Sequence, residues 1–397
     1  MIAFTFPGQG SQAPAMGEAW CDHPSWELVA EASDASGRDV AYLLTQAAKD
    51  ELTETHNAQL ATFTASMIVL DAVERLGVEP AALAGHSLGE YSALTAAGVL
   101  SFADAVRLVT ERGEAMRAAC DDRTGTMAAV LGLDDDLVAQ ACDDIDTEAW
   151  VANFNAPGQV VIAGSPEGLE RATTRVKELG AKRVMAIPVS GAFHTPFMES
   201  ARERLLKAIG TAEVRDADLP VYANVDASPH TEAAKWADLL VEQLTSPVRW
   251  RRTLYELADA GVTTFVELGP GTVLTGLAKR TVKGTRTISV ANPGDLDSLL
   301  TELSTNNATE CGALEGEHLF ATERLVVSPG AGIFMPTEQL ASGSTIEVGS
   351  TIGRVGQVQV RSPFHGALMG LLALEGERVT ASQPIAWLRS SLAAQSI

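Results

Sequence analysis

Residues 82–91 read Ala-Leu-Ala-Gly-His-Ser-Leu-Gly-Glu-Tyr, and this stretch decides the fold of the chain. A short apolar run ends in the pattern Gly85-x-Ser87-x-Gly89, and a helical pattern follows from residue 90 to 97. Strand, sharp turn and helix in this order are the setting of a nucleophile elbow. The two glycines fit because side chains there would clash with neighbouring backbone. Ser87 is therefore a candidate nucleophile, and the alternative is a glycine-rich connection that carries a surface serine.

The composition limits the possible classes of protein. The chain has 397 residues, 46% of them hydrophobic and 20% charged, which is enough for a large core and two to three domains. A net charge of −22 argues against nucleic acid as a partner. The four cysteines form no C-x-x-C pair, so we expect no metal site and no disulfide framework, and a reducing cytoplasm. Without a signal peptide pattern or a bilayer-spanning run, no membrane association is expected.

Strands alternate with helices on both sides of an insertion. Apolar runs flanked by helical patterns predict an α/β class with a mostly parallel, helix-covered sheet in residues 1–125 and 190–295. Between them, residues 126–189 follow the order β-α-β-β-α-β, which predicts an inserted ferredoxin-like subdomain. Because His194 lies where the chain leaves this insertion, it is expected at a cleft between domains.

The remainder of the chain has a different pattern. Residues 296–318 predict a helix that fades into a polar linker. Residues 319–397 are all-β in character, with short apolar runs separated by Ser-Pro, glycine and acidic turns. The segment from residue 327 resembles the segment from residue 361, which predicts a flattened barrel of two similar halves.

Three further residue types could complete a site around Ser87. His194, in an apolar segment, is the best candidate base among seven histidines, although a structural histidine is the competing interpretation. Arg112 lies in a helical pattern that starts at Ser101, where a lone arginine is more often solvated. The loop containing Gln9 directly follows a predicted strand, so it is either a ligand-facing loop or a tight turn.

Six motifs in the same order resemble the malonyl-CoA:acyl carrier protein transacylase family, over residues 1 to about 295. The motifs are Phe-Pro-Gly-Gln-Gly-Ser-Gln (6–12), Gly-His-Ser-Leu-Gly-Glu (85–90), Glu-Arg-Gly (111–113), Asn-Phe-Asn-Ala-Pro-Gly-Gln (153–159), Phe-His (193–194) and Gly-Pro-Gly (269–271). Together they are much more specific than the serine motif alone. The resemblance implies an α/β-hydrolase-like large domain and transfer of a malonyl group to acyl carrier protein in fatty-acid synthesis.

The same resemblance implies roles for individual residues. Ser87 would be the nucleophile of a ping-pong reaction, and His194 would be its general base. The backbone N–H groups of Gln9 and Leu88 would form the oxyanion hole. Arg112 matches the arginine that holds the malonyl carboxylate in a bidentate pair. The substrates would be malonyl-CoA and the phosphopantetheine thiol of acyl carrier protein, with no cofactor and no metal.

Three more positions follow from the family pattern. The base would be oriented by a backbone carbonyl at the Pro-Val-x-Trp turn, which is Arg249 here. Asn155 would line the pocket from the small subdomain. Phe193 resembles the residue of malonyl-selective acyltransferases, where a bulky ring would clash with the methyl group of a methylmalonyl substrate, worth about 1–3 kcal/mol.

Two features stay outside this pattern. An acidic carrier protein would need a local basic patch on an acidic chain, and Lys182, Arg183, Lys279 and Arg280 are the candidates. The C-terminal region resembles biotinyl/lipoyl carrier domains, but no lysine follows Lys283 to carry the prosthetic group. Packing, oligomer contacts, docking or a structural remnant are the roles that remain. Nothing in the sequence indicates the oligomeric state.

Three other functions compete with malonyl transfer for fatty-acid synthesis. An acyltransferase that supplies a polyketide synthase fits equally well, and the accepted carrier protein would distinguish the two. A serine thioesterase or lipase would need neither Arg112 nor the Gln9 loop. A non-catalytic scaffold would not need the combination of Ser87, His194 and Arg112.

Overall fold

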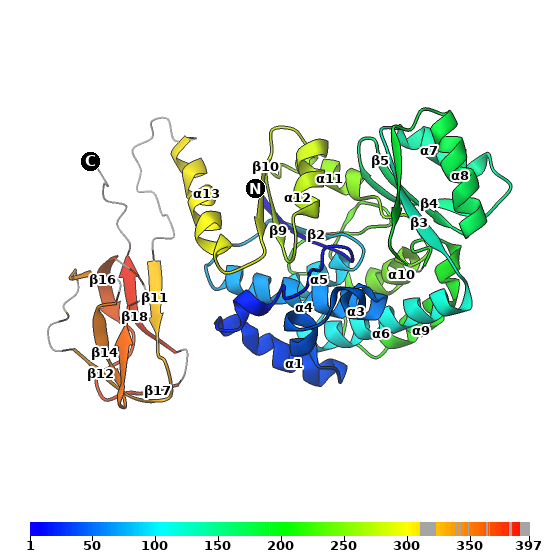
Figure 1. Ribbon diagram of the computed structural model, residues 1–397. Coiled ribbons are helices and arrows are strands. Elements are labelled where there is room, and N and C mark those ends of the chain that lie inside the picture. The colour runs from blue at the N-terminus through cyan, green and yellow to red at the C-terminus, as the bar shows by residue number, and fades with distance from the viewer. Residues whose placement is uncertain are drawn as a thin grey trace. The chain divides into compact units, whose positions relative to one another are not determined.

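The computed structural model describes residues 1–189, 191–309, 323–337, 340, 343–347, 349–362, 364, 366–380 and 383–389. The chain separates into two units, Met1–Glu310 and Cys311–Ile397, and each is described by itself (Figure 1). The predicted helix and linker of residues 296–318 is described only up to residue 309, and its remainder lies outside the described residues.

A six-stranded sheet with the order β10-β9-β1-β2-β7-β8 is the centre of the larger unit. Five of the strands are parallel, and only β8 pairs antiparallel with its neighbour β7. The strands are β1 (Ile2–Phe6), β2 (Ala82–Gly85), β7 (Val221–Tyr222), β8 (Pro229–His230), β9 (Thr264–Leu268) and β10 (Arg286–Val290). The parallel sheet predicted from the alternating pattern is therefore present.

Both faces of this sheet are covered, as expected for parallel strands. Alternate residues of β1 point to opposite sides: Phe4 and Phe6 join a large core with the first six helices, whereas Ala3 joins a smaller core with α11 and α12. The helices outside the insertion are α1 (Glu27–Ser36), α2 (Val40–Thr45), α3 (Lys49–Thr53), α4 (Thr55–Glu74), α5 (Gly89–Ala96), α6 (Phe102–Asp122), α9 (Glu199–Ile209), α10 (Ala233–Gln243), α11 (Trp250–Asp259), α12 (Val273–Thr281) and α13 (Asp295–Thr309), with short 3-10 turns η1 (Glu18–Trp20), η2 (Pro24–Trp26) and η3 (Pro196–Met198).

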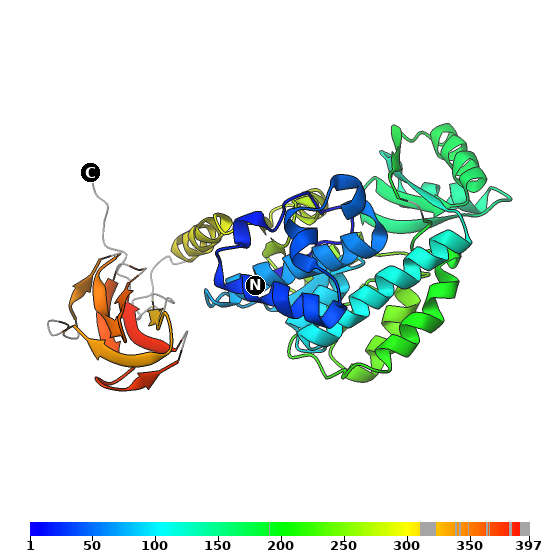
Figure 2. The same cartoon turned by 60° about the horizontal axis from the view of Figure 1, so that its bottom comes forward.

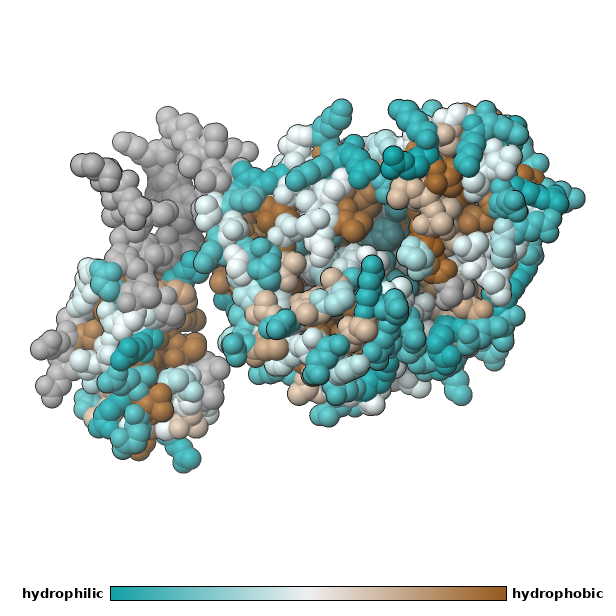
Figure 3. Space-filling model, viewed as in Figure 1, coloured by the Kyte–Doolittle hydropathy of each residue, from teal (hydrophilic) through white to brown (hydrophobic). Residues whose placement is uncertain are grey.

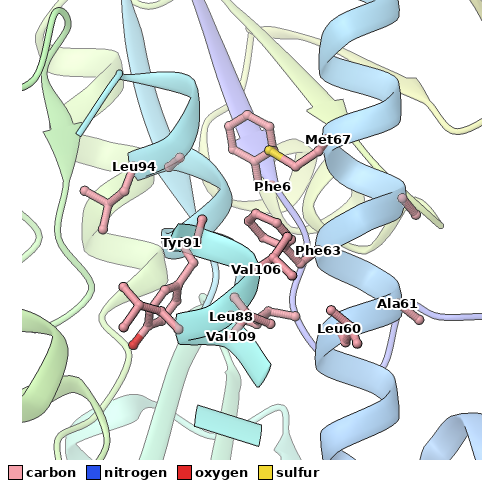
Figure 4. Close-up of a cluster of buried hydrophobic side chains, with 14 of the residues drawn as sticks. Phe6, Leu60, Ala61, Phe63, Met67, Leu88, Tyr91, Leu94, Val106 and Val109 are labelled. Carbon is pink, nitrogen blue, oxygen red and sulfur yellow. The ribbon is translucent and has the colours of Figure 1, made fainter. Parts of the chain in front are cut away.

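The core beneath the serine turn is built from α4, α5 and α6 (Figure 4). Leu88, directly after the serine, is 1% exposed and lies among Leu60, Phe63 and Val109. Burying a leucine side chain contributes about 1.5–3 kcal/mol relative to exposing it. The buried side chain of Leu88 therefore anchors the turn to the core, whereas Ser87 in the same turn is only partly buried.

The insertion forms a second sheet with the order β4-β5-β3-β6, and all of its pairs are antiparallel. Its elements are β3 (Thr126–Leu131), α7 (Asp135–Asp143), β4 (Ala149–Ala156), β5 (Gln159–Gly164), α8 (Pro166–Glu178) and β6 (Arg183–Ile187). Both helices pack on one face of this sheet around a core of their own (Figures 1 and 2). The other face of the sheet is left to contact the large domain.

Backbone hydrogen bonds connect the insertion to the large domain. The amide of Val248 donates to the carbonyl of Ala152 at 2.9 Å, and the amide of Phe154 donates to the carbonyl of Val248 at 2.9 Å. Arg251 on α11 also pairs with the buried Asp135 on α7, with 2.8 Å between Nη1 and Oδ2. The segment before α11 is thus held by β4, which limits which of its carbonyls can reach the site.

The helix that was predicted to lead into a linker belongs to the larger unit. Leu299 of α13 is fully buried, and Leu296 is 9% exposed within the large core. The helix begins at Asp295, whose carboxylate accepts from the amides of Ala291 and Asn292. A helix with a buried apolar side adds to the core of the larger unit, so the first part of the predicted linker is a packed element.

Within its described residues, the smaller unit contains two four-stranded sheets, with the orders β11-β18-β16-β13 and β15-β14-β12-β17. The strands are β11 (Glu323–Val327), β12 (Gly332–Pro336), β13 (Thr345–Ile346), β14 (Thr351–Val355), β15 (Val358–Arg361), β16 (Gly366–Leu371), β17 (Arg378–Val379) and β18 (Pro384–Arg389). Phe334, Ile352 and Leu388 lie in its core. Val355 pairs with Val358, so Gly356 and Gln357 form a two-residue turn, with Gly356 at φ +58°.

Candidate active site

The serine turn joins β2 to α5 at the carboxyl end of the parallel sheet. Ser87 has φ +52°, a left-handed conformation that is strained for a residue with a side chain. A Cβ atom on Gly85 would lie 1.8 Å from the carbonyl oxygen of Gly89, and one on Gly89 would lie 2.1 Å from that of Phe6. Both positions therefore require glycine, for the steric reason that the sequence pattern suggested.

Ser87 and His194 form a hydrogen-bonded pair. Ser87 Oγ lies 2.8 Å from His194 Nε2, although 107 residues separate the two positions. His194 Nδ1 lies 2.8 Å from the carbonyl oxygen of Gln243. Because a carbonyl can only accept, Nδ1 carries the proton, and Nε2 is left to accept from the serine hydroxyl. His194 itself has φ +59°, so both partners are held in strained backbone conformations.

The surroundings keep His194 uncharged. Its side chain is buried, and burial together with the nearby Arg112 charge lowers its pKa to about 3. A neutral imidazole whose free nitrogen faces a hydroxyl can take up the proton of that hydroxyl. The arrangement therefore fits a general base at neutral pH.

The carbonyl that orients His194 is that of Gln243, so the prediction of Arg249 is wrong. Gln243 is the last residue of α10, where a helix has carbonyls without partners inside the helix. The carbonyl of Arg249 instead accepts from the amide of Thr253 at 3.0 Å, at the start of α11. The Arg249 side chain donates to the carbonyl of Val225. The carbonyl of Arg249 is therefore already paired with α11 and does not orient His194.

Arg112 lies beside the nucleophile and is only 1% exposed. Its Nη1 donates to Gln59 Oε1 at 2.7 Å, and its Nη2 contacts Gln243 Oε1 at 2.9 Å and Ser87 Oγ at 3.2 Å. All three acceptors are neutral oxygens. Burial lowers the pKa of Arg112, but a guanidinium stays charged in proteins. The site thus offers an anionic group a buried cation next to the nucleophile.

Two residues that the sequence analysis did not select connect this set. Asn224 Oδ1 accepts from the amide of Ser87 at 2.7 Å, and its Nδ2 donates to the carbonyl of Gly85 at 2.7 Å. Glu90, fully buried on α5, accepts from the backbone N–H of Asn224 at 2.8 Å and from the side-chain Nε2 of Gln243. Burial raises the pKa of Glu90 to about 8, against the lowering effects of these donors and of Arg112. The sequence signal that could have identified Glu90 is an acidic residue in a helical pattern that otherwise lacks charged residues.

A cavity of about 200 Å³ opens above Ser87, His194 and Arg112. Gln9 and Phe193 line it from the large domain, and Asn155 lines it from β4 of the insertion. Asn155 Oδ1 accepts from His86 Nε2 at 2.8 Å, which turns the His86 ring away from the role of base. The space-filling view shows hydrophobic surface around a hollow between the two parts of this unit (Figure 3).

Of the two predicted oxyanion donors, Gln9 lines this cavity, and Leu88 directly follows the lining residue Ser87. Gln9 follows β1 and Leu88 follows Ser87, so both belong to loops at the carboxyl ends of adjacent strands. Neither backbone N–H donates to an acceptor within the part of the chain that the structure describes. Pairs of unoccupied amides at such a position are suited to bind a negatively charged oxygen.

The four basic candidates for carrier docking lie in two places. Arg183 is the first residue of β6 and Lys182 directly precedes it, whereas Lys279 and Arg280 are in the last turn of α12. Arg280 Nη1 donates to Gln159 Oε1 at 2.7 Å, so α12 reaches the insertion there. Across the described residues, no group of three or more histidine, cysteine or acidic side chains could hold a metal ion. Nor is any described helix long and apolar enough to cross a membrane.

A Ser–His pair with a buried histidine, at the carboxyl end of a parallel sheet, defines a serine-dependent enzyme that handles acyl groups. Comparison with known proteins narrows the class: the chain belongs to the acyl transferase family, since the family described as "Acyl transferase domain" matches residues 3–306. This confirms the family resemblance of the sequence motifs. The smaller unit lies outside the matched residues.

Curated relatives and solved structures agree with this assignment. The chain is 43% identical over 311 residues to the malonyl CoA-acyl carrier protein transacylase of Bacillus subtilis, covering 77% of this chain and 98% of that protein. With the Escherichia coli protein of the same name the identity is 44%, covering 73% and 96%. An acyl carrier protein S-malonyltransferase structure from Vibrio cholerae matches with a TM-score of 0.73 at 41% identity, covering 75% and 99%. A structure of a type II polyketide acyl-carrier protein in complex with its malonyl-transacylase also matches, with a TM-score of 0.73 at 38% identity. The match covers 76% of this chain and 99% of that chain.

Proposed function

We propose that this protein transfers the malonyl group from malonyl-CoA to the phosphopantetheine thiol of acyl carrier protein, in fatty-acid synthesis. The observation that carries the proposal is the position of Arg112, whose Nη2 lies 3.2 Å from Ser87 Oγ. An acyl chain on that oxygen places the far carboxylate of a malonyl group within reach of the guanidinium. A hydrolase of neutral esters has no use for a buried cation there.

The first half-reaction forms a malonyl-serine ester. Ser87 Oγ attacks the thioester carbonyl carbon while His194 Nε2 takes the hydroxyl proton. The negative oxygen of the tetrahedral intermediate is stabilised by the amides of Gln9 and Leu88. The carbon–sulfur bond then breaks, and His194 returns the proton to the departing CoA sulfur. The Gln243 carbonyl stabilises the imidazolium between these two steps.

The second half-reaction reverses these roles. The phosphopantetheine thiol of the carrier protein gives its proton to His194, and its sulfur attacks the ester carbonyl. The oxyanion donors act again, the bond to Ser87 Oγ breaks, and His194 returns the proton to the serine. The chemistry requires no cofactor and no acidic third residue.

Two cavity residues determine the fit of the acyl group. We propose that Phe193, beside the base, excludes a methyl group on the α-carbon, and that Asn155 borders the acyl group from the insertion. One methyl group is worth about 1–3 kcal/mol of discrimination. Selection against methylmalonyl-CoA is therefore expected to be incomplete.

The architecture supports finer proposals. We assign the large sheet to the α/β-hydrolase-like type, from its parallel order and serine elbow. The insertion is assigned to the ferredoxin-like type, and the smaller unit to the biotinyl/lipoyl-like type without a lysine for attachment. The cytoplasmic location stays a prediction from the sequence.

Carrier docking near α12 and β6 is a separate part of the proposal. Lys182, Arg183, Lys279 and Arg280 would attract an acidic carrier protein. Reversing all four charges is expected to raise the KM for carrier protein and to leave the KM for malonyl-CoA unchanged. An unchanged KM for carrier protein would dismiss this surface.

Intact-protein mass spectrometry after incubation with malonyl-CoA, without an acceptor, tests the central proposal. The expected result is one malonyl adduct, located on Ser87 by peptide mapping and absent from Ser87→Ala. Release of free malonate faster than transfer to carrier protein would favour a thioesterase instead.

Polyketide synthesis is the second candidate pathway, because one matching structure is a malonyl-transacylase bound to a type II polyketide carrier protein. Transfer assays with the two kinds of carrier protein distinguish them. A higher kcat/KM with a fatty-acid carrier protein supports the first pathway, and the reverse order supports the second.

A further inference from the structure

Glu90 is a buried carboxyl group that the reaction steps above do not use. It lies in the first turn of α5, three residues after Ser87, and is 0% exposed. Its two oxygens face two different donors: Oε1 accepts from the Asn224 amide at 2.8 Å, and Oε2 accepts from Gln243 Nε2. A buried carboxyl group is costly, so its contacts indicate what it does.

Gln243 is the residue that touches all three members of the site. Its carbonyl accepts from His194 Nδ1, its Nε2 donates to the carbonyl of Ser87 at 2.9 Å, and its Oε1 accepts from Arg112 Nη2 at 2.9 Å. The contact with Arg112 exists only while the side-chain amide presents its oxygen to the guanidinium. If this amide were turned over, its NH₂ group would face Arg112, and two donors would oppose each other.

Glu90 decides which way this amide points. Both described hydrogen bonds of Glu90 are accepted ones, and an ionised carboxylate has no proton to donate. The NH₂ group of Gln243 therefore faces Oε2, and the oxygen of Gln243 is directed at Arg112. The Ser87 carbonyl adds a second acceptor on the same side. The other oxygen of Glu90 binds the Asn224 amide, and Asn224 in turn holds the amide of Ser87. One carboxyl group thus supports the serine turn and the arginine.

We propose that Glu90 is a positioning residue for acyl-group selection, which fixes the Gln243 amide and through it the guanidinium of Arg112. This inference rests on the proposed malonyl transfer. Glu90 contacts neither reacting atom, so it acts only through Gln243 and Asn224. Its effect should appear in the preference for an acyl group with a carboxylate, more than in the chemistry common to all acyl groups.

The substitution Glu90→Gln tests this without changing the size of the side chain. An ionised carboxylate accepts at both oxygens and donates at neither, whereas the amide nitrogen of a glutamine can only donate. The backbone N–H of Asn224 can only donate, so the side-chain oxygen of the introduced glutamine takes the place of Glu90 Oε1. Its NH₂ group then faces Gln243, which must turn over, so Arg112 loses an acceptor and the Ser87 carbonyl loses a donor.

The measurement is kcat/KM for loading of malonyl-CoA and of acetyl-CoA. Wild type and variants are compared at one pH above 8, because burial raises the pKa of Glu90 to about 8 and the carboxylate is the form that only accepts. We expect Glu90→Gln to lower the malonyl-to-acetyl ratio by at least about tenfold, with acetyl loading within about threefold of wild type. An unchanged ratio in a folded variant would overturn the proposal. Equal losses on both substrates would also overturn it, because they indicate a merely structural role.

Glu267→Gln is the matched control. Glu267 is likewise a buried carboxyl group, 1% exposed, and its oxygens accept from the amides of Leu274 and Thr275 at 3.1 and 2.7 Å. It touches neither Gln243 nor Asn224 among its described hydrogen bonds. This variant should lose stability and keep the malonyl-to-acetyl ratio.

If Glu90→Gln does not fold, Gln243→Met carries the test. Methionine has a similar length but no amide, and the backbone carbonyl at this position still orients His194. The malonyl-to-acetyl ratio should fall here too, whatever the change in absolute rates, and an unchanged ratio would overturn the link from Glu90 to Arg112. If wild type loads acetyl and malonyl groups equally well, the proposed function fails. If wild type prefers malonyl and the variants keep that preference, only the positioning role fails.

Discussion

The two units of this chain differ in how architecture relates to chemistry. In the larger unit, Ser87, His194 and Arg112 come from separate elements and meet at one cavity, and every role in the proposed reaction has a residue. For the smaller unit we propose the biotinyl/lipoyl-like type, but a turn of Gly356 and Gln357 stands between β14 and β15, and no lysine follows Lys283 to carry a prosthetic group. The difference teaches that a fold indicates a function only where the reactive group is also present.

The largest effect is expected from removing the nucleophile. Ser87→Ala should lower malonyl transfer by about 10⁴-fold or more, since the oxyanion donors and the binding site alone give little turnover. Transfer from malonyl-CoA to carrier protein measures this. Retention of more than about a hundredth of wild-type activity would place the covalent step elsewhere.

The pH dependence of loading tests the state of His194. Its pKa is lowered to about 3 by burial, so the neutral base persists well below the usual value of 6.5. The acid limb of kcat/KM for malonyl-CoA, which reports the free enzyme, should therefore lie far below pH 6.5. The profile is to be measured only over the pH range in which circular dichroism shows a folded protein. An acid limb centred near pH 6.5 would contradict the assignment.

An intermediate effect is expected at the acyl pocket. Phe193→Ala should improve methylmalonyl loading relative to malonyl by about 5–150-fold, the equivalent of about 1–3 kcal/mol. Competition between the two CoA esters, read by intact-protein mass, gives the ratio directly. If both esters lose loading equally, Phe193 supports the position of His194 and does not select the acyl group.

The smallest effect is expected from the smaller unit. A chain that ends at residue 310 keeps the whole larger unit, including the cavity. Its kcat/KM for malonyl-CoA should stay within about twofold of the full chain. A large loss, in a truncated protein with an unchanged melting temperature, would show that the smaller unit takes part in the reaction and would end the contrast between the two units.

Much of the larger unit could be predicted from local sequence. The glycines around Ser87 have a steric reason that is visible in the pattern, and α5 (Gly89–Ala96) lies within one residue of the helical pattern predicted for residues 90–97. The wrong assignment of Arg249 has a physical cause as well. A backbone carbonyl has no signature in sequence, and which one reaches His194 depends on where α10 ends.

The hydrogen bonds that hold Arg112 and Ser87 in place could not be predicted from the sequence for a similar reason. Arg112 meets Gln59 and Gln243 across 53 and 131 residues, and Ser87 meets Asn224 across 137. Such pairs follow no local spacing, so single-sequence patterns cannot select them. The acidic Glu90 in a buried helix was the one local sign of the network.

Loading of Arg112→Ala with malonyl-CoA and acetyl-CoA tests the central claim most directly, because a carboxylate is the only feature that Arg112 is proposed to recognise. Loss of two charge-assisted hydrogen bonds, at about 1.5–3 kcal/mol each, predicts a fall in malonyl kcat/KM of at least about 100-fold. Acetyl loading on Ser87 should stay unchanged or rise. An equal loss on both substrates would contradict the account.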